Sequence, residues 1–309
     1  MELCVYDRNQ PGKMMSLSNM RNTLRALHQG DLFPLRPRAT WILDDMEYQD
    51  NTAAQTFWSG TGITVATNSA AEQEGSYCLS CATDATANRI AATTQTLNLS
   101  GFASLKVWHR VNATSQAFKL YLKDGDGNIS YWDLTSHGTT DTWKQDTLTL
   151  ATPSSNNGTN ADLSDIVEWG FSSLPASKTF LFDTVKAFAG MAVAIDAATI
   201  GSYRENVYAG QTRIAFAGGP SPTITAPAAN PRIDLLCYNP TTGALAWTTG
   251  TEASSPAEPA APSDKIPICL VYTKVGMTQV VNYEERASFS GDGYIYKDVR
   301  PLYGFVTIF

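Results

Sequence analysis

The chain has 309 residues, of which 43% are hydrophobic and only 17% charged, a composition that can fill a packed core and excludes a disordered chain or a coiled coil. Its formal net charge of −7 at pH 7 argues against nucleic acid as the partner of the whole chain. The longest apolar run, residues 187–195, has about half the length of a membrane-spanning helix, so we expect no membrane insertion.

The first predicted unit is an N-terminal docking arm, residues 1–40, with six basic and three acidic side chains. Met20, Leu24 and Leu27 repeat at helical spacing and predict one short amphipathic helix. The opening sequence MELCVYDRNQ has no apolar stretch, so we expect no signal peptide. Because one short helix cannot form a core alone, we expect the arm to pack on the body of its own chain or on a neighbouring chain, and we favour docking into a larger particle.

Residues 41–189 consist of short β-prone runs separated by turn sequences, which predicts an antiparallel β-sandwich or barrel. Alternation is clearest over 104–111, where Leu105 and Val107 share one face and Lys106 and Trp108 the other. The predicted strands are 42–48, 62–67, 76–82, 88–97, 104–111, 116–123, 128–134, 144–150, 165–172 and 179–188.

The sequence DGDGN, residues 124–128, has acidic side chains at alternate positions, as a calcium-binding loop does. The twelfth position counted from Asp124 is Thr135, however, where such a loop needs a bidentate Glu. Asp-Gly pairs between two β-prone runs are also typical of hairpin turns, and we favour a hairpin here.

The runs DDMEYQD, EGSYCLSC, LNLSGFASLKVWHRV, ADLSDIVEWGFSS and KTFLFDTVKAF resemble, in this order, the segments of a jelly-roll carbohydrate-binding module of the galactose-binding-like type. The resemblance implies a jelly-roll sandwich for residues 41–189. It also implies a structural calcium ion between the first strand, the EGS loop and the last strand, where oxygen ligands would join the two sheets. The matching positions are Asp45, Glu47, Gly75 and Asp183.

Three aromatic residues are candidates for sugar binding on the outer faces of the sandwich: Trp108, Tyr121 and Trp132. Aromatic rings stack on the apolar faces of pyranose rings, while polar neighbours hydrogen-bond the hydroxyls. The alternative is that these large side chains fill the core of the sandwich.

Residues 190–309 predict a second β-rich module, with strands at 207–217 and 231–238, a Gly-marked hairpin, a Pro-rich connector at 251–267 and a strand in ICLVYTKV. The order PRID, Gly243, TG, prolines, IPI and KDVR resembles a module of bacteriophage tail-fibre, baseplate and other virion proteins. That resemblance implies an assembly module. Its short core favours a homo-oligomer, most plausibly a homotrimer, over a self-sufficient domain.

The two resemblances together predict a bacteriophage virion structural protein, in a tail fibre, a baseplate or a capsid decoration, whose sandwich binds host-surface glycans. Its partners would be other virion proteins and copies of itself, and it would be made in the host cytoplasm and located in the virion. The alternative is a carbohydrate-binding accessory module of a secreted polysaccharide-degrading system. The chain has three histidines and no G-x-S-x-G, H-E-x-x-H or phosphate-loop sequence, so we expect no enzyme and no cofactor besides calcium.

Overall fold

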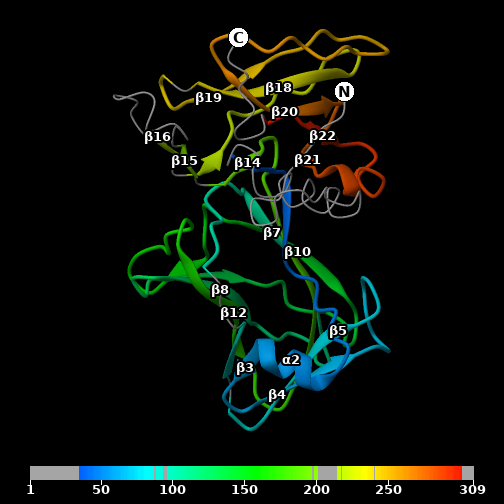
Figure 1. Cartoon of the computed structure of the whole chain (residues 1–309). Helices are drawn as coiled ribbons and strands as arrows, with labels where there is room; N and C mark the ends of the chain where they lie inside the picture. The colour runs from blue at the N-terminus through cyan, green and yellow to red at the C-terminus, as the bar shows by residue number, and fades with distance from the viewer. Residues whose placement is uncertain are drawn as a thin grey trace, which may run out of the picture.

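The computed structural model describes residues 35–86, 88–92, 96–196, 198–200, 214–216, 218–239 and 241–300. The predicted helix of the arm and most of the strand expected at 207–217 lie outside these residues. Figure 1 shows a β-sandwich in one half of the molecule and a smaller β-rich module in the other. No helix in the described ranges is long and apolar enough to cross a membrane.

The sandwich has two six-stranded antiparallel sheets, between which the chain crosses repeatedly, as a jelly roll requires. The first sheet contains, in order, β10 (Lys144–Thr149), β7 (Ser104–Val111), β13 (Thr179–Phe188), β5 (Cys78–Thr83) and β4 (Ile63–Asn68), with β2 (Thr40–Asp44) paired to β13. The second contains β11 (Ser155–Asn156), β9 (Ile129–Asp133), β8 (Lys119–Asp124), β12 (Ile166–Leu174), β6 (Asn88–Ala92) and β3 (Trp58–Gly60). The predicted fold class, mainly β with an antiparallel sandwich, is confirmed.

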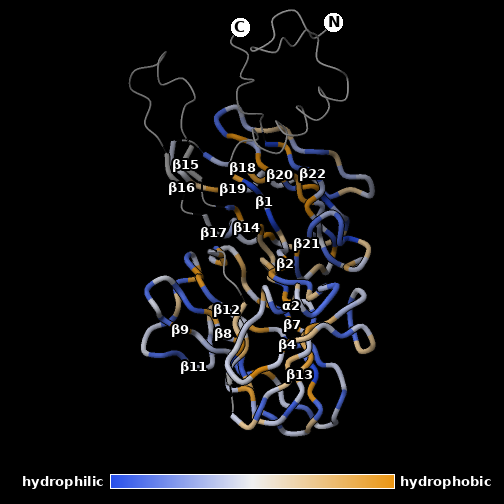
Figure 2. The backbone as a smooth tube through the Cα atoms, turned by 60° about the horizontal axis from the view of Figure 1, so that its bottom comes forward, coloured by the Kyte–Doolittle hydropathy of each residue, from blue (hydrophilic) through white to orange (hydrophobic). Residues whose placement is uncertain are grey.

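The sandwich core forms where the inward faces of the two sheets meet. Strand β7 alternates between buried and half-buried residues along its whole length, with Leu105 and Val107 inside, as its sequence predicts. Across the core, the rings of Phe171 and Phe182 stack with centroids 3.6 Å apart. Figure 2 shows the hydrophobic stretches on strands of both halves and the hydrophilic stretches mainly on loops.

Two local features differ from the sequence prediction. The first strand ends at Asp44, not at residue 48, because Met46 takes a positive φ of 59° and its N–H donates to Asp44 Oδ1. The helix α2 (Asn51–Phe57) was not predicted; the side chain of Asp50 caps it by accepting from the N–H of Ala53.

The predicted hairpin at DGDGN forms between β8 and β9, and Asp124 accepts from the backbone and the side chain of Asn128.

The second module is built on a five-stranded sheet with the order β19 (Leu245–Thr248), β18 (Arg232–Tyr238), β20 (Ile266–Thr273), β22 (Gly293–Asp298) and β21 (Val280–Val281). A 3-10 helix, η1 (Tyr283–Glu285), lies between the last two strands along the chain. Short pairs join the halves: β1 (Pro37–Arg38), β14 (Ala194–Ile195) and β17 (Gly219–Pro220) form one sheet, and β15 (Ala198–Ile200) pairs with β16 (Ile214–Phe216).

The second module, whose sequence suggested a core too short for a self-sufficient domain, contains a buried hydrophobic cluster. Leu236, Tyr238 and Val271 belong to a fully buried cluster on one face of the sheet. Leu35 and Ala39, at the end of the predicted arm, are buried in the same cluster, so residues 35–39 pack with the second module. The homo-oligomer, which was inferred from the short core of residues 190–309, stays a prediction from the sequence.

The R-x-D element of the virion resemblance forms a buried ion pair. Arg232 Nε donates to Asp234 Oδ1 over 2.9 Å, and Asp234 Oδ1 also accepts from the N–H of Gly250. A side chain at Gly250 would collide with the carbonyl of Ile233, which explains the glycine there. These contacts help to hold the five-stranded sheet of the second module together.

Candidate functional site

A cleft of about 270 Å³ lies on the outer face of the first sheet, where the second module approaches it. Its floor is formed by outward side chains of three adjacent strands, and its far wall by the segment that follows η1. The lining residues are Glu74, Lys106, Trp108, Gln145, Thr184, Lys186, Phe188, Glu285, Ser288 and Phe289. Trp108 is therefore partly exposed beside a cavity, as the strand alternation predicts.

The loop that carries Glu74 into the cleft is anchored by two buried or half-buried acids. Asp183 Oδ2 accepts from the N–H groups of Gln73 at 2.8 Å and Glu74 at 3.0 Å. Glu47 Oε1 accepts from the N–H of Ser76 at 2.8 Å, further along the loop. Burial raises the pKa of Asp183, and the two N–H donors oppose that shift.

The anchored loop fixes the orientation of the tryptophan. Trp108 Nε1 donates to Glu74 Oε1 over 2.7 Å, so the indole is held at its edge while its ring remains beside the cavity. A ring held in this way loses little conformational freedom when a ligand stacks on it.

The central strand of the sheet is irregular beside the cleft. The pairing of β13 with β7 shifts between Asp183 and Val185, and the extra residue, Thr184, has a φ of 29°. Bulges of this kind redirect side chains and concentrate near functional sites. Here the bulge places Thr184 in the cleft lining and brings Lys186 into line with Lys106.

The two lysines occupy directly paired positions on neighbouring strands. The ammonium of Lys106 lies 4.3 Å from the ring centroid of Phe188, and that of Lys186 lies 5.5 Å from it. Lys186 also forms an ion pair with Glu285 of the second module. Burial, together with the charge of Lys106, lowers the pKa of Lys186, whereas the charge of Glu74 raises it.

Among the residues implied as calcium ligands, Asp45 is exposed, and one carboxylate oxygen each of Glu47 and Asp183 accepts backbone N–H groups. A Cβ on Gly75 would overlap Glu47, so the glycine lets the carboxylate approach the loop. Within the described ranges, no three His, Cys, Asp or Glu side chains gather as metal ligands.

Two of the three predicted sugar-binding residues are not accessible. Trp132 is 3% exposed and belongs to the core, where its Nε1 donates to the carbonyl of Thr149. The sequence prediction placed Trp132 on the outer face. In β9, however, Ser130 and Trp132 point inward, and Tyr131 between them points outward. Tyr121 has 0% exposure, although it projects from the opposite face to Leu120. The three residues therefore form no common platform.

On the outer face of the second sheet of the sandwich, paired charged side chains cover Tyr121. The Arg89 guanidinium lies 4.6 Å from the ring centroid of Tyr121 and forms an ion pair with Glu168. Glu168 also accepts from the Tyr121 hydroxyl and pairs with Lys123. This face is a closed network in which each of these groups has a partner.

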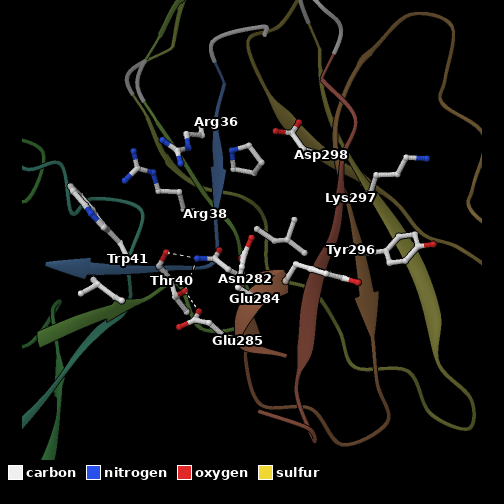
Figure 3. A pocket seen from close by; sticks show the side chains of 14 residues that line it. Arg36, Arg38, Thr40, Trp41, Asn282, Glu284, Glu285, Tyr296, Lys297 and Asp298 are labelled. Atoms are coloured by element: carbon white, nitrogen blue, oxygen red, sulfur yellow. Dashed lines mark hydrogen bonds between the residues drawn. The ribbon is translucent and has the colours of Figure 1, made fainter. Parts of the chain in front are cut away.

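A larger groove of about 570 Å³ lies between residues 36–42 and the second module (Figure 3). Ile42, Tyr283 and Tyr296, which are 48%, 44% and 40% exposed, line it. At its base Asn282 donates to the carbonyl of Thr40, and the Thr40 hydroxyl donates to Glu285. Glu285 thus belongs to the groove and to the cleft, and it joins the two modules.

The histidines of the sandwich form a buried chain apart from both cavities. His109 Nε2 bonds Asp146 over 2.9 Å, and His109 Nδ1 bonds His137 Nε2 over 2.9 Å. Burial, with the nearby His109, lowers the pKa of His137 to about 4. We assign these residues a structural role, as expected for His109 in a strand.

Several cleft residues were missed from the sequence. The alternation of Lys106 and Trp108 was visible, but the bulge at Thr184 breaks the period in β13 and hides Lys186 from a pattern of two. Glu285 and Phe289 come from a different module, and no local pattern indicates that they reach the sandwich.

No protein-family model matches the chain, and no curated protein matches it. Among solved structures, it is similar to a family 11 carbohydrate-binding module from Clostridium thermocellum in complex with a β-1,3-1,4-mixed-linked tetrasaccharide, with 14% identity and a TM-score of 0.37 over 50% of this chain and 96% of that one. The CBM22-1 xylan-binding domain from Paenibacillus barcinonensis matches with 16% identity and a TM-score of 0.33 over 49% and 97%. A mutant family 29 module in complex with cellulohexaose matches with 7% identity and a TM-score of 0.31 over 50% and 92%.

These structural neighbours are carbohydrate-binding modules with jelly-roll folds, and the virion resemblance finds no support among them. At such identities and TM-scores, their ligands do not carry over to this chain. Any function of the cleft has to follow from its own residues.

Proposed function

We propose that the sandwich binds carbohydrate in the cleft and that Trp108 is the stacking residue. The observation that carries the proposal is the Trp108 ring, which is partly exposed beside a cavity and fixed at its edge by Glu74. Such a ring can stack on the apolar face of a pyranose without being ordered first.

The cleft also supplies polar groups that suit sugar hydroxyls. Gln145, Thr184 and Ser288 line it, and their side chains can both donate and accept hydrogen bonds. Its volume of about 270 Å³ lies near the lower end of ligand pockets, roughly 300–1,000 Å³. We therefore expect it to hold one sugar residue of a chain rather than enclose an oligosaccharide.

The proposal is binding without turnover. The two carboxylates of the cleft are engaged: Glu74 accepts from Trp108, and Glu285 pairs with Lys186 and accepts from Thr40. A glycosidase uses two carboxyl groups on either side of the scissile bond, whereas here we infer that both cleft carboxylates hold side chains of the protein in place. Release of reducing ends from any polysaccharide that the protein retains would contradict this point.

A role as a carbohydrate-binding accessory module fits this site better than a virion role. One element of the virion resemblance, Arg232 with Asp234, makes contacts within the second module and identifies no partner. Virion assembly and the homotrimer stay predictions from the sequence, and so do the docking arm and the virion location.

Retention on polysaccharides in affinity electrophoresis tests the proposal. We expect Trp108→Ala to abolish retention on every polysaccharide that slows the parent protein, with an unchanged unfolding midpoint. Trp41→Ala is the matched control, because Trp41 is a half-buried tryptophan that lines the groove and not the cleft. Equal retention of the Trp108 variant and the parent would overturn the proposal.

A further inference from the structure

The two lysines of the cleft place like charges opposite each other on neighbouring strands. Lys106 and Lys186 are direct cross-strand neighbours and face the same cavity. Like charges in such a pair repel each other and destabilise the sheet. Both ammonium groups also lie within 5.8 Å of the Phe289 ring centroid, so the second module closes over them and reduces their hydration.

Two carboxylates, Glu74 and Glu285, line the same cleft, so its formal charges cancel, but they are not shared equally between the two lysines. Glu285 neutralises Lys186, and Glu74 is oriented by its hydrogen bond from Trp108. Among the described residues, Lys106 makes no ion pair with a carboxylate; its contacts are with the rings of Phe188 and Phe289. Its ammonium therefore retains donors for a ligand at the point where the cavity adjoins Trp108.

On the other face of the sandwich, two lysines each have a carboxylate partner. Lys119 pairs with Asp133 at 3.1 Å, and Lys123 pairs with Glu168 at 3.4 Å. The chain as a whole is acidic, with a formal net charge of −7, so general electrostatics would repel a polyanion. Attraction of an anion can arise only from a local cluster such as this one.

Building on the proposed function, we propose that the sugar residue held beside Trp108 carries an anionic group, which binds between Lys106 and Lys186. The group is a carboxylate, as in a uronic acid, or a sulfate ester. Either one accepts charge-assisted hydrogen bonds from two ammonium groups and relieves their repulsion. The ligand class is therefore an acidic polysaccharide.

Matched polymers test the inference with the full chain. Polygalacturonate is compared with its methyl ester, and a sulfated galactan with its desulfated form, by affinity electrophoresis at two salt concentrations. We expect at least one charged polymer to retain the parent protein more strongly than its neutral partner does. This difference in retention should decrease at high salt. The pair that shows the difference identifies the anionic group.

The variant Lys106→Met keeps the alkyl stem and removes the charge. We expect about tenfold weaker binding to the charged polymer, the usual loss for a charge-assisted hydrogen bond, and a smaller loss for the neutral one. Lys119→Met is the control and should bind as the parent does.

The outcomes separate the two proposals. Retention that depends on Trp108 but is equal for charged and neutral polymers, and unaffected by Lys106→Met, overturns the acidic ligand class and leaves carbohydrate binding standing. No retention on any of the four polymers overturns the acidic ligand class, and retention that does not depend on Trp108 overturns both.

Discussion

The two outer faces of the sandwich differ in how their charges are arranged. On the second sheet, Arg89, Lys123 and Glu168 form a closed network that covers Tyr121. On the first, Lys106 and Lys186 face each other over a cavity beside a fixed tryptophan. Both faces carry aromatic rings and lysines, so residue type alone does not distinguish them. The difference lies in whether each charge already has a partner.

The largest expected effect separates the core from the cleft. Trp132→Ala should lower the free energy of unfolding by roughly 3–5 kcal/mol, because it removes a buried ring from the sandwich core. Trp108→Ala should lower it by less than about 1 kcal/mol, as for a partly exposed residue. Urea unfolding of both variants measures the difference, and equal destabilisation would contradict the assignment of Trp108 to the outer face.

The next effect concerns the loop that orients the tryptophan. Asp183→Ala should cost roughly 2–3 kcal/mol, because the N–H groups of Gln73 and Glu74 lose a buried acceptor. It should also weaken retention on polysaccharide. Asp45→Ala is the control: Asp45 is exposed, and among the described residues its side chain accepts a hydrogen bond from the nearby N–H of Glu47. Similar unfolding midpoints for the two variants would show that Asp183 does not anchor the loop.

A third effect should come from the histidine chain. Because the pKa of His137 is about 4 in the folded protein and 6.5 in the unfolded chain, the unfolded chain takes up a proton first as the pH falls. The stabilisation is therefore complete above about pH 6.5 and is lost progressively toward pH 4, by roughly 2 kcal/mol. Urea unfolding between pH 7 and 4.5 measures the slope. His137→Gln should flatten it, and an unchanged slope in that variant would assign the titration elsewhere.

A smaller effect, of opposite sign on the two faces, tests the charge comparison itself. Without ligand, Lys106→Met should leave stability unchanged or raise it by up to about 0.5 kcal/mol, since it removes a like-charge neighbour of Lys186. Lys119→Met should lower it by up to about 1 kcal/mol, since it breaks the pair with Asp133. Destabilisation by both variants to the same extent would remove the distinction between the faces.

The smallest expected effect is that of calcium removal. Since one oxygen each of Glu47 and Asp183 already accepts backbone N–H groups of the loop, we expect the loop to hold without an ion and a chelator to leave the unfolding midpoint unchanged. A midpoint that rises on addition of calcium would restore the ion that the jelly-roll resemblance implies.

The strands of the sandwich could be predicted because each is a local pattern. Lys106 and Trp108 share a face by alternation over eight residues of β7, and the DGDGN hairpin is encoded in five residues. The faces of Tyr121 and Trp132 also follow from alternation, but their exposure does not. It depends on Arg89 and on the opposite sheet, which come from distant parts of the chain.

The cleft itself could be predicted only in part. The bulge at Thr184 shifts the register of β13 by one residue, and nothing in the sequence KTFLFDTVKAF marks its position. Glu285 reaches Lys186 from 99 positions along the chain, through packing between modules. Local patterns carry no information about such contacts.

The most direct test of the account follows the indole N–H signals of the seven tryptophans in a nitrogen-15 NMR spectrum, while an acidic oligosaccharide is titrated in. The account predicts that the Trp108 signal shifts most, because its N–H donates to Glu74 at the edge of the cleft. The Trp132 signal, from the core beneath the opposite face, should not move. A Trp108 signal that stays in place while signals of Tyr131 and its neighbours on the second sheet shift would move the binding site to the other face and contradict the account.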